Sequence, residues 1–113
     1  MSQKLIDAAI AGQLEVVKQP IEGGDNVNFE NYTGLTPLHS AAKHGRKEVC
    51  QFLVESGANV KQPNKYSATP LHYAAERGHK DVCEFLVERG ADVKQPNHDG
   101  NTPLHYAVTR WQN

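Results

Sequence analysis

Apolar residues recur three and four positions apart in two neighbouring segments in the middle of the chain. The two sets are Leu38, Ala41 and Ala42, then Val49, Phe52 and Leu53. This spacing places side chains on one face of an α-helix. The pattern therefore predicts a helix from about Pro37 to His44 and a second from about Lys47 to Ser56, with Gly45 and Gly57 as their ends.

The same pattern returns after 33 residues. The tetrapeptide Thr-Pro-Leu-His stands at 36–39, 69–72 and 102–105. Self-similarity at a fixed period of this size indicates an array of structural repeats. The period predicts further helices from about Pro70 to Arg77 and from about Lys80 to Arg89. The apolar set at 49, 52 and 53 returns as Val82, Phe85 and Leu86. Other residues that recur after 33 positions are Gly12, Gly45 and Gly78; Gly24, Gly57 and Gly90; Val27, Val60 and Val93; and Cys50 and Cys83.

The tetrapeptide has the composition of a helix start. A threonine hydroxyl accepts a hydrogen bond from an N–H of the first helical turn. Proline follows at the first helical position, where its missing N–H costs nothing. The small alanines allow a neighbouring helix to approach closely. Glycine then suits a left-handed conformation at the helix end.

This motif and period resemble the ankyrin repeat. The resemblance implies an all-α solenoid of stacked helix-turn-helix units with projecting β-turns or hairpins. It divides the single domain, 1–113, into a divergent N-terminal capping repeat (1–30), two full repeats (31–63 and 64–96) and a partial last repeat (97–113). The projecting segments are expected at about 58–68 and 90–101, which hold the turn residues.

Both end repeats depart from the pattern. Pro20 stands where leucine is found at 53 and 86. Interior proline removes a helical hydrogen bond and clashes with the carbonyl four residues back, so we expect the helix from about Leu14 to Glu22 to be shortened or kinked. In the last repeat, Trp111 replaces the terminating glycine. We expect Trp111 to shield the open end, within the chain or against another molecule.

Composition excludes several functional classes. Twelve Lys and Arg face thirteen Asp and Glu, giving a formal charge of −1 with no basic run, so a nucleic-acid partner is not expected. There is neither a long apolar segment typical of a membrane span nor the apolar core of a signal peptide. Two cysteines at one repeat position indicate buried residues in a reducing compartment. We therefore expect a cytoplasmic or nuclear protein that is not secreted.

The residue types that carry catalysis are spaced too far apart to act together. His39, His72 and His105 occupy equivalent positions in stacked repeats, roughly 8–10 Å apart, whereas zinc ligands lie about 2 Å from one point. We expect each ring to tie its own hairpin to its helix, and the remaining histidines, His44, His79 and His98, to be solvated. Cys50 and Cys83 lie among apolar residues, which suppress thiol reactivity. No catalytic residue, metal or cofactor is predicted, so the chain is not expected to be an enzyme.

The predicted function is binding of a protein partner through the concave face. The resemblance implies that hairpin tips and exposed residues of the first helices make the contact. Carried over by position, these residues are Tyr32, Thr33, Leu35, Ser40, Lys43 and His44; Lys65, Tyr66, Ala68, Tyr73, Glu76 and Arg77; His98, Asp99, Asn101, Tyr106, Thr109 and Arg110. All four tyrosines belong to this set, and tyrosine and arginine dominate binding hot spots. Alternatively, Tyr73 and Tyr106 only pack against the hairpin stems.

Three other interpretations stay open. The stack could self-associate through its incomplete C-terminal end as a structural protein, or the chain could be a piece of a larger adaptor, channel or enzyme. It could also be a substrate, because Asn28 resembles the turn asparagine that ankyrin-directed hydroxylases modify, although Lys61 and Lys94 stand at the equivalent positions of later repeats. None of these patterns identifies the partner.

Overall fold

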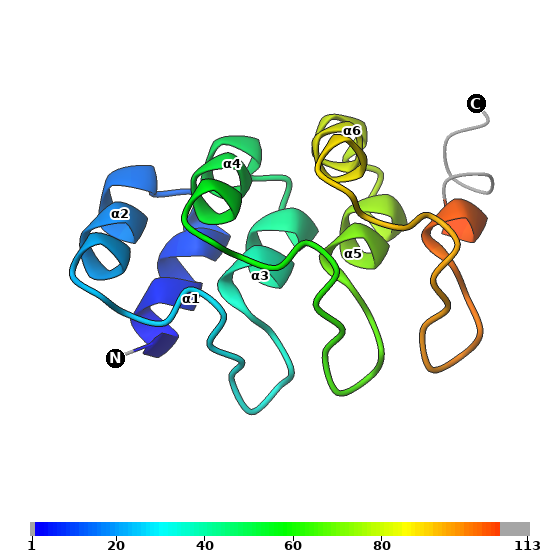
Figure 1. The fold of residues 1–113 in the computed structure, drawn as a ribbon, viewed down its shortest axis with the longest axis horizontal. Helices are drawn as coiled ribbons and strands as arrows, with labels where there is room; N and C mark the ends of the chain where they lie inside the picture. The colour runs from blue at the N-terminus through cyan, green and yellow to red at the C-terminus, as the bar shows by residue number, and fades with distance from the viewer. Residues whose placement is uncertain (1, 107–113) are drawn as a thin grey trace.

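Six short helices form two layers in the computed structural model, which describes residues 2–106. Figure 1 shows the helices stacked in pairs along the longest axis of the molecule, whose extents are 40 × 25 × 21 Å. A further helical turn begins at Pro103. The helices are α1 (Ser2–Ala11), α2 (Leu14–Glu22), α3 (Pro37–Lys43), α4 (Lys47–Glu55), α5 (Pro70–Glu76) and α6 (Lys80–Glu88).

One layer holds the first helix of each repeat and the other holds the second. Helices α1, α3 and α5 pack side by side, and α2, α4 and α6 form the second row. The loops between repeats project from the side of the stack opposite α2, α4 and α6 (Figure 1). This arrangement confirms the predicted helical solenoid. Each helix of the two full repeats ends one residue before its predicted end.

The helix starts follow the chemistry of the Thr-Pro motif. The Thr36 hydroxyl accepts from the backbone N–H of His39 at 3.2 Å, and Pro37 is the first helical residue. Thr69 and His72 repeat this contact at the start of α5. Local sequence therefore determines where the first helix of each repeat begins.

The core lies between the two layers and runs through every repeat. Leu38, Leu53, Leu71 and Leu86 are fully buried. The alanines of the first helices are buried as well, which lets α1, α3 and α5 pack closely: Ala8, Ala9, Ala41, Ala42, Ala74 and Ala75.

Successive repeats are joined at the ends of their first helices. Gly45 follows α3 with φ of +71°, and a Cβ at this position would lie 2.7 Å from Nδ1 of His79. The His79 Nε2 donates to the carbonyl of Lys43 at 3.0 Å. One repeat earlier, Arg46 Nε donates in the same way to the carbonyl of Ile10 at 2.9 Å. The residue directly before the second helix of one repeat thus satisfies a terminal carbonyl of the repeat before it.

The prediction that His79 is solvated was therefore wrong. Its ring is half-buried, because it covers Gly45 and reaches the end of α3. His44 is also half-buried, with Nδ1 3.1 Å from the carbonyl of Ser40. Of the three, only His98 is exposed.

Pro20 was predicted to shorten or kink α2, and the prediction of a shortened helix was wrong. The helix spans nine residues, as do α4 and α6. Backbone bonding continues past the proline, because Gly23 N donates to Gln19 O at 3.0 Å. Pro20 is half-buried, and Val17 is the buried residue of α2. A proline near the end of an outer helix interrupts one hydrogen bond and leaves the remaining turns intact.

Replacing Pro20 should still stabilise the protein. Pro20→Ala restores an N–H that can donate to the carbonyl of Val16, and we expect the free energy of unfolding to rise by roughly 2 kcal/mol. Pro20→Leu should add less than about 1 kcal/mol more, because the site is only half-buried. Urea unfolding measures the free energy of unfolding of both variants, and Gln19→Ala is the control for a change on the exposed face of α2. A stability equal to or below that of the unsubstituted protein would show that α2 has adapted to Pro20.

Candidate functional site

A buried histidine connects each full repeat to the loop that follows it. The His39 Nε2 donates to the carbonyl of Ala68 at 2.9 Å, so this nitrogen carries the ring proton. Its Nδ1 lies 2.7 Å from the Thr36 hydroxyl. In the next repeat, His72 Nδ1 accepts from the backbone N–H of Thr69 at 2.9 Å, and Nε2 donates to the carbonyl of Asn101 at 3.2 Å. Both rings are neutral in this arrangement, with one nitrogen accepting and the other donating.

These contacts extend the role predicted for the histidines. Each ring was expected to hold its own hairpin to its helix, but the structure shows a bond between residues 29 positions apart. Ala68 directly precedes the Thr-Pro motif of the next repeat, and Asn101 precedes the one after. The ring therefore links the helix start of one repeat to the helix start of the next.

Burial makes protonation of these rings unfavourable. Desolvation lowers the pKa of His39 from 6.5 to about 4, partly offset by the hydrogen bond to the Ala68 carbonyl. Desolvation also lowers the pKa of His72. An unfolded chain binds a proton at these positions near pH 6.5, whereas the folded chain does not.

Stability should consequently fall as the pH falls from 6.5 towards 4. In this window the unfolded state binds more protons than the folded state, so acid favours unfolding. Since one pKa unit corresponds to about 1.4 kcal/mol, His39 can contribute up to roughly 3 kcal/mol of this loss. Urea unfolding across the window should show a shallower pH slope for His39→Gln than for the unsubstituted protein or for the exposed-site control His98→Gln. Equal slopes in all three proteins would contradict a buried neutral ring.

Three asparagines at one repeat position organise the projecting loops. The Asn64 Oδ1 accepts from the backbone N–H groups of Tyr66 and Ala68, at 2.9 and 3.0 Å. Asn31 and Asn97 use their Oδ1 atoms in the same way. The loops are therefore hydrogen-bonded turns, and residues 2–106 contain no β-strand. Sequence reasoning did not assign this role, although the spacing of 33 residues was the available signal.

The same asparagines position two of the tyrosines. The Asn64 Nδ2 donates to the Tyr73 hydroxyl at 2.9 Å, and Asn97 Nδ2 donates to the Tyr106 hydroxyl at 3.3 Å. The Tyr73 ring also meets the His39 ring edge-on, with 5.8 Å between centroids. Both tyrosines thus pack against the loop stems and remain half-buried, with part of each ring accessible.

Two of the residues carried over to the binding surface are buried and cannot contact a partner. Ser40 and Ala68 lie in the interior. Ser40 occupies the position of Tyr73, but its side chain is too short to reach the loop, and its hydroxyl has no hydrogen-bond partner. The Asn31 Nδ2 donates to Gln3 Oε1 instead. The tyrosine pattern of the later repeats is therefore absent from the second repeat.

The other predicted surface residues are accessible to different degrees. Tyr32 is 86% exposed and Tyr66 is 50% exposed. Thr109 and Arg110 lie outside the described residues. The exposed positions are Tyr32, Thr33, Lys65, Tyr66, Arg77, His98 and Asp99, and the half-buried ones are Leu35, Lys43, His44, Tyr73, Glu76, Asn101 and Tyr106.

Seven of the predicted residues meet around one cleft between the last two projecting loops. The cleft has a volume of about 440 Å³. Tyrosines from three places in the chain form much of its lining, together with two carboxylates. The predicted residues in the lining are Tyr66, Tyr73, Glu76, His98, Asp99, Tyr106 and the buried Ala68; His72 and Asn97 complete it. Arg77, which was also predicted to belong to the binding surface, does not line this cleft.

A family model described as ankyrin repeats, in three copies, matches residues 5–97 and 68–113. The chain belongs to the ankyrin-repeat family. Ankyrin repeats generally mediate protein–protein interaction. A search of the curated proteins finds no match to this chain.

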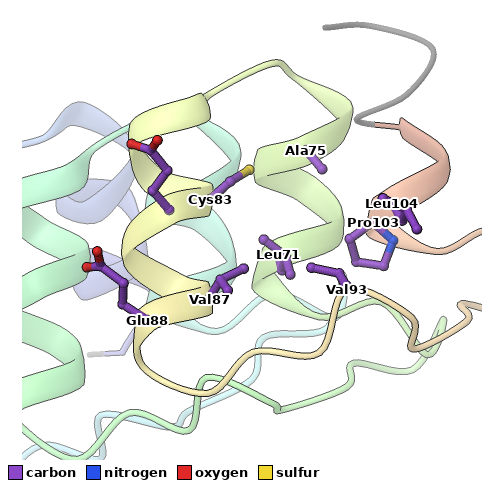
Figure 2. Close-up of a pocket in the computed structure, with 9 residues that line it drawn as sticks. Leu71, Ala75, Cys83, Val87, Glu88, Val93, Pro103 and Leu104 are labelled. Carbon is purple, nitrogen blue, oxygen red and sulfur yellow. The ribbon is translucent and has the colours of Figure 1, made fainter.

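This ankyrin stack has a second, apolar hollow beside α6. Figure 2 shows Leu71 and Ala75 on α5 and Val87 on α6 facing the chain at Pro103 and Leu104. The hollow has a volume of about 550 Å³. Val87 and Leu104 are 43% and 46% exposed. Trp111, which was expected to shield this end, lies outside the described residues.

The ankyrin scaffold places its cysteines where they are unreactive. Cys50 and Cys83 are buried and not in a disulfide. Desolvation, with a smaller contribution from the Asp81 carboxylate, raises the pKa of each thiol to about 12. Neither thiol supplies a thiolate nucleophile near neutral pH.

Within residues 2–106, no three His, Cys, Asp or Glu side chains are arranged to hold a metal ion. No helix in that range is long and apolar enough to cross a membrane. Asn28, the residue that resembles a hydroxylase target, is half-buried. Its Oδ1 accepts from Asn59 N at 3.1 Å and its Nδ2 donates to Gly57 O at 3.4 Å, so it joins the first two repeats.

Proposed function

We propose that this protein is a non-enzymatic binding module that holds a protein partner on the face formed by the projecting loops and the first helices. The observation that carries the proposal is the cleft between the last two loops, because seven residues predicted from sequence position line it together. Clefts of this size are typical of specific binding sites.

The arrangement of the tyrosines supports this assignment. Tyr73 and Tyr106 are held by asparagine side chains, and Tyr66 follows an asparagine-bonded turn. Aromatic side chains held in this way offer large contact area with little loss of rotamer freedom on binding. Arg77 adds a fork of donors at the exposed end of α5. A single partner segment that crosses two repeats would contact several of these residues.

Truncation of the exposed residues should weaken binding and leave the fold intact. We expect Tyr66→Ala and Arg77→Ala each to lower the affinity for a partner captured from the source cell by at least about 1–2 kcal/mol. Both side chains are exposed, so their removal should change the free energy of unfolding by less than about 0.5 kcal/mol. Calorimetric titration measures the binding term, and urea unfolding measures the stability.

Matched controls lie on the opposite layer. Glu55 and Glu88 are exposed on α4 and α6, and Glu55→Ala and Glu88→Ala should be near neutral. If these two variants lose affinity while the Tyr66 and Arg77 variants keep it, the partner binds the layer of second helices and the proposed binding face is wrong.

The apolar hollow beside α6 favours a second candidate function, self-association of the stack. Val87 and Leu104 are large apolar side chains that stay exposed there. If copies associate through this end, light scattering should show a mass that rises with concentration, and Val87→Glu should return the mass to that of the monomer. Val16→Glu, at a similarly exposed apolar position on α2, is the control. A constant monomer mass at high concentration argues against this function.

A further inference from the structure

We propose that the cleft between the last two loops binds a basic side chain of the partner, an arginine in particular, presented by an extended segment. This inference rests on the proposed binding function and specifies the chemistry of the partner. It goes beyond the sequence pattern, because the cleft is assembled from residues of two repeats.

The charge of the cleft supports a cationic occupant. Glu76 and Asp99 contribute carboxylates to the lining, and no lysine or arginine side chain within residues 2–106 lines it. Among the described residues, neither carboxylate makes a hydrogen bond or an ion pair within the chain. Because Asp99 is exposed and Glu76 half-buried, both can turn towards a ligand.

The aromatic walls act in the same direction. Tyr66, Tyr73 and Tyr106 line the cleft, and a cation is attracted to the face of an aromatic ring within about 6 Å of its centroid. Two of these rings already attract cations of this chain. Lys43 Nζ lies 5.8 Å from the Tyr73 centroid, and Lys65 Nζ lies 5.4 Å from the Tyr66 centroid. Neither lysine lines the cleft.

The hydrogen-bonding state of the lining also suits a donor. Tyr73 accepts from Asn64 and Tyr106 accepts from Asn97, which fixes both hydroxyl groups at the loop stems. The His72 ring uses Nε2 as a donor to the Asn101 carbonyl and Nδ1 as an acceptor from Thr69. The anionic groups in the lining that can pair with a charged donor are Glu76 and Asp99. A guanidinium matches this set, because it stacks on aromatic rings and binds a carboxylate through two parallel N–H groups.

The test uses three short peptides and the full chain. The probes are acetyl-Gly-Arg-Gly-amide, its citrulline analogue, which is isosteric and uncharged, and acetyl-Gly-Lys-Gly-amide. Titrations followed by backbone amide NMR shifts should show the arginine peptide binding at least about tenfold tighter than the citrulline peptide. The shifted amides should be those of Tyr66, Tyr73 and residues 97–101. The lysine peptide should bind more weakly than the arginine peptide.

Charge-neutral variants connect the binding to the carboxylates. Glu76→Gln and Asp99→Asn should each lower affinity for the arginine peptide several-fold, while Glu55→Gln, an exposed carboxylate on α4, should leave it unchanged. Equal binding of the arginine and citrulline peptides, full binding by the Glu76→Gln/Asp99→Asn double variant, or shifts confined to other surfaces would overturn the proposal. Binding of the lysine peptide as tightly as the arginine peptide would overturn the assignment to arginine.

The captured partner separates this inference from the proposed function. If Tyr66→Ala lowers the affinity for the captured partner but the Glu76→Gln/Asp99→Asn double variant does not, the proposed binding face is supported and the proposal of a basic occupant is wrong. If none of the loop-face variants affects the partner, the proposed function itself fails, whatever the peptides show.

Discussion

The buried imidazole that spans two repeats is the contact on which the arrangement of the loops depends. The Nδ1 of His39 accepts a hydrogen bond from the Thr36 hydroxyl, and its Nε2 donates to the Ala68 carbonyl. The helix start, the helix and the next loop are thereby held in a single hydrogen-bonded unit. Because the ring lies in the interior, loss of either bond leaves a buried polar group unsatisfied. The contact recurs at His72, so the second loop is placed relative to the first by the same chemistry.

The surface chemistry differs along the stack because the loop asparagines meet different partners. Asn64 and Asn97 bind tyrosine hydroxyls, whereas Ser40 stands in place of the tyrosine in the second repeat and Asn31 binds Gln3 instead. An aromatic cleft forms only where two such tyrosines face adjacent loops. The scaffold is therefore repetitive, but its candidate binding site belongs to one junction between repeats.

The cleft between the loops and the hollow beside α6 favour different occupants. The cleft between the loops combines aromatic rings with carboxylates, which favours a polar, cationic ligand. The hollow beside α6 is lined mainly by apolar side chains, and Glu84 and Glu88 also contribute to its lining. This lining favours an apolar surface of another molecule as the occupant. Since the lining residues of the hollow come mainly from helices and those of the cleft from loops and helix α5, variants can separate the two surfaces.

The sequence alone determined the repeat, the helix starts and the core. Threonine caps, N1 prolines and terminating glycines act within a few residues, so their effect is visible in the chain itself. Contacts between residues about 30 positions apart were decided only by the tertiary structure. Ser40 and Ala68 are buried by neighbouring elements, His79 bonds to the preceding repeat, and α2 keeps its length despite Pro20. Likewise, Glu76 and Asp99 line the same cleft because their two repeats stack on each other. The sequence around one residue does not specify which side chains of the next repeat will lie beside it.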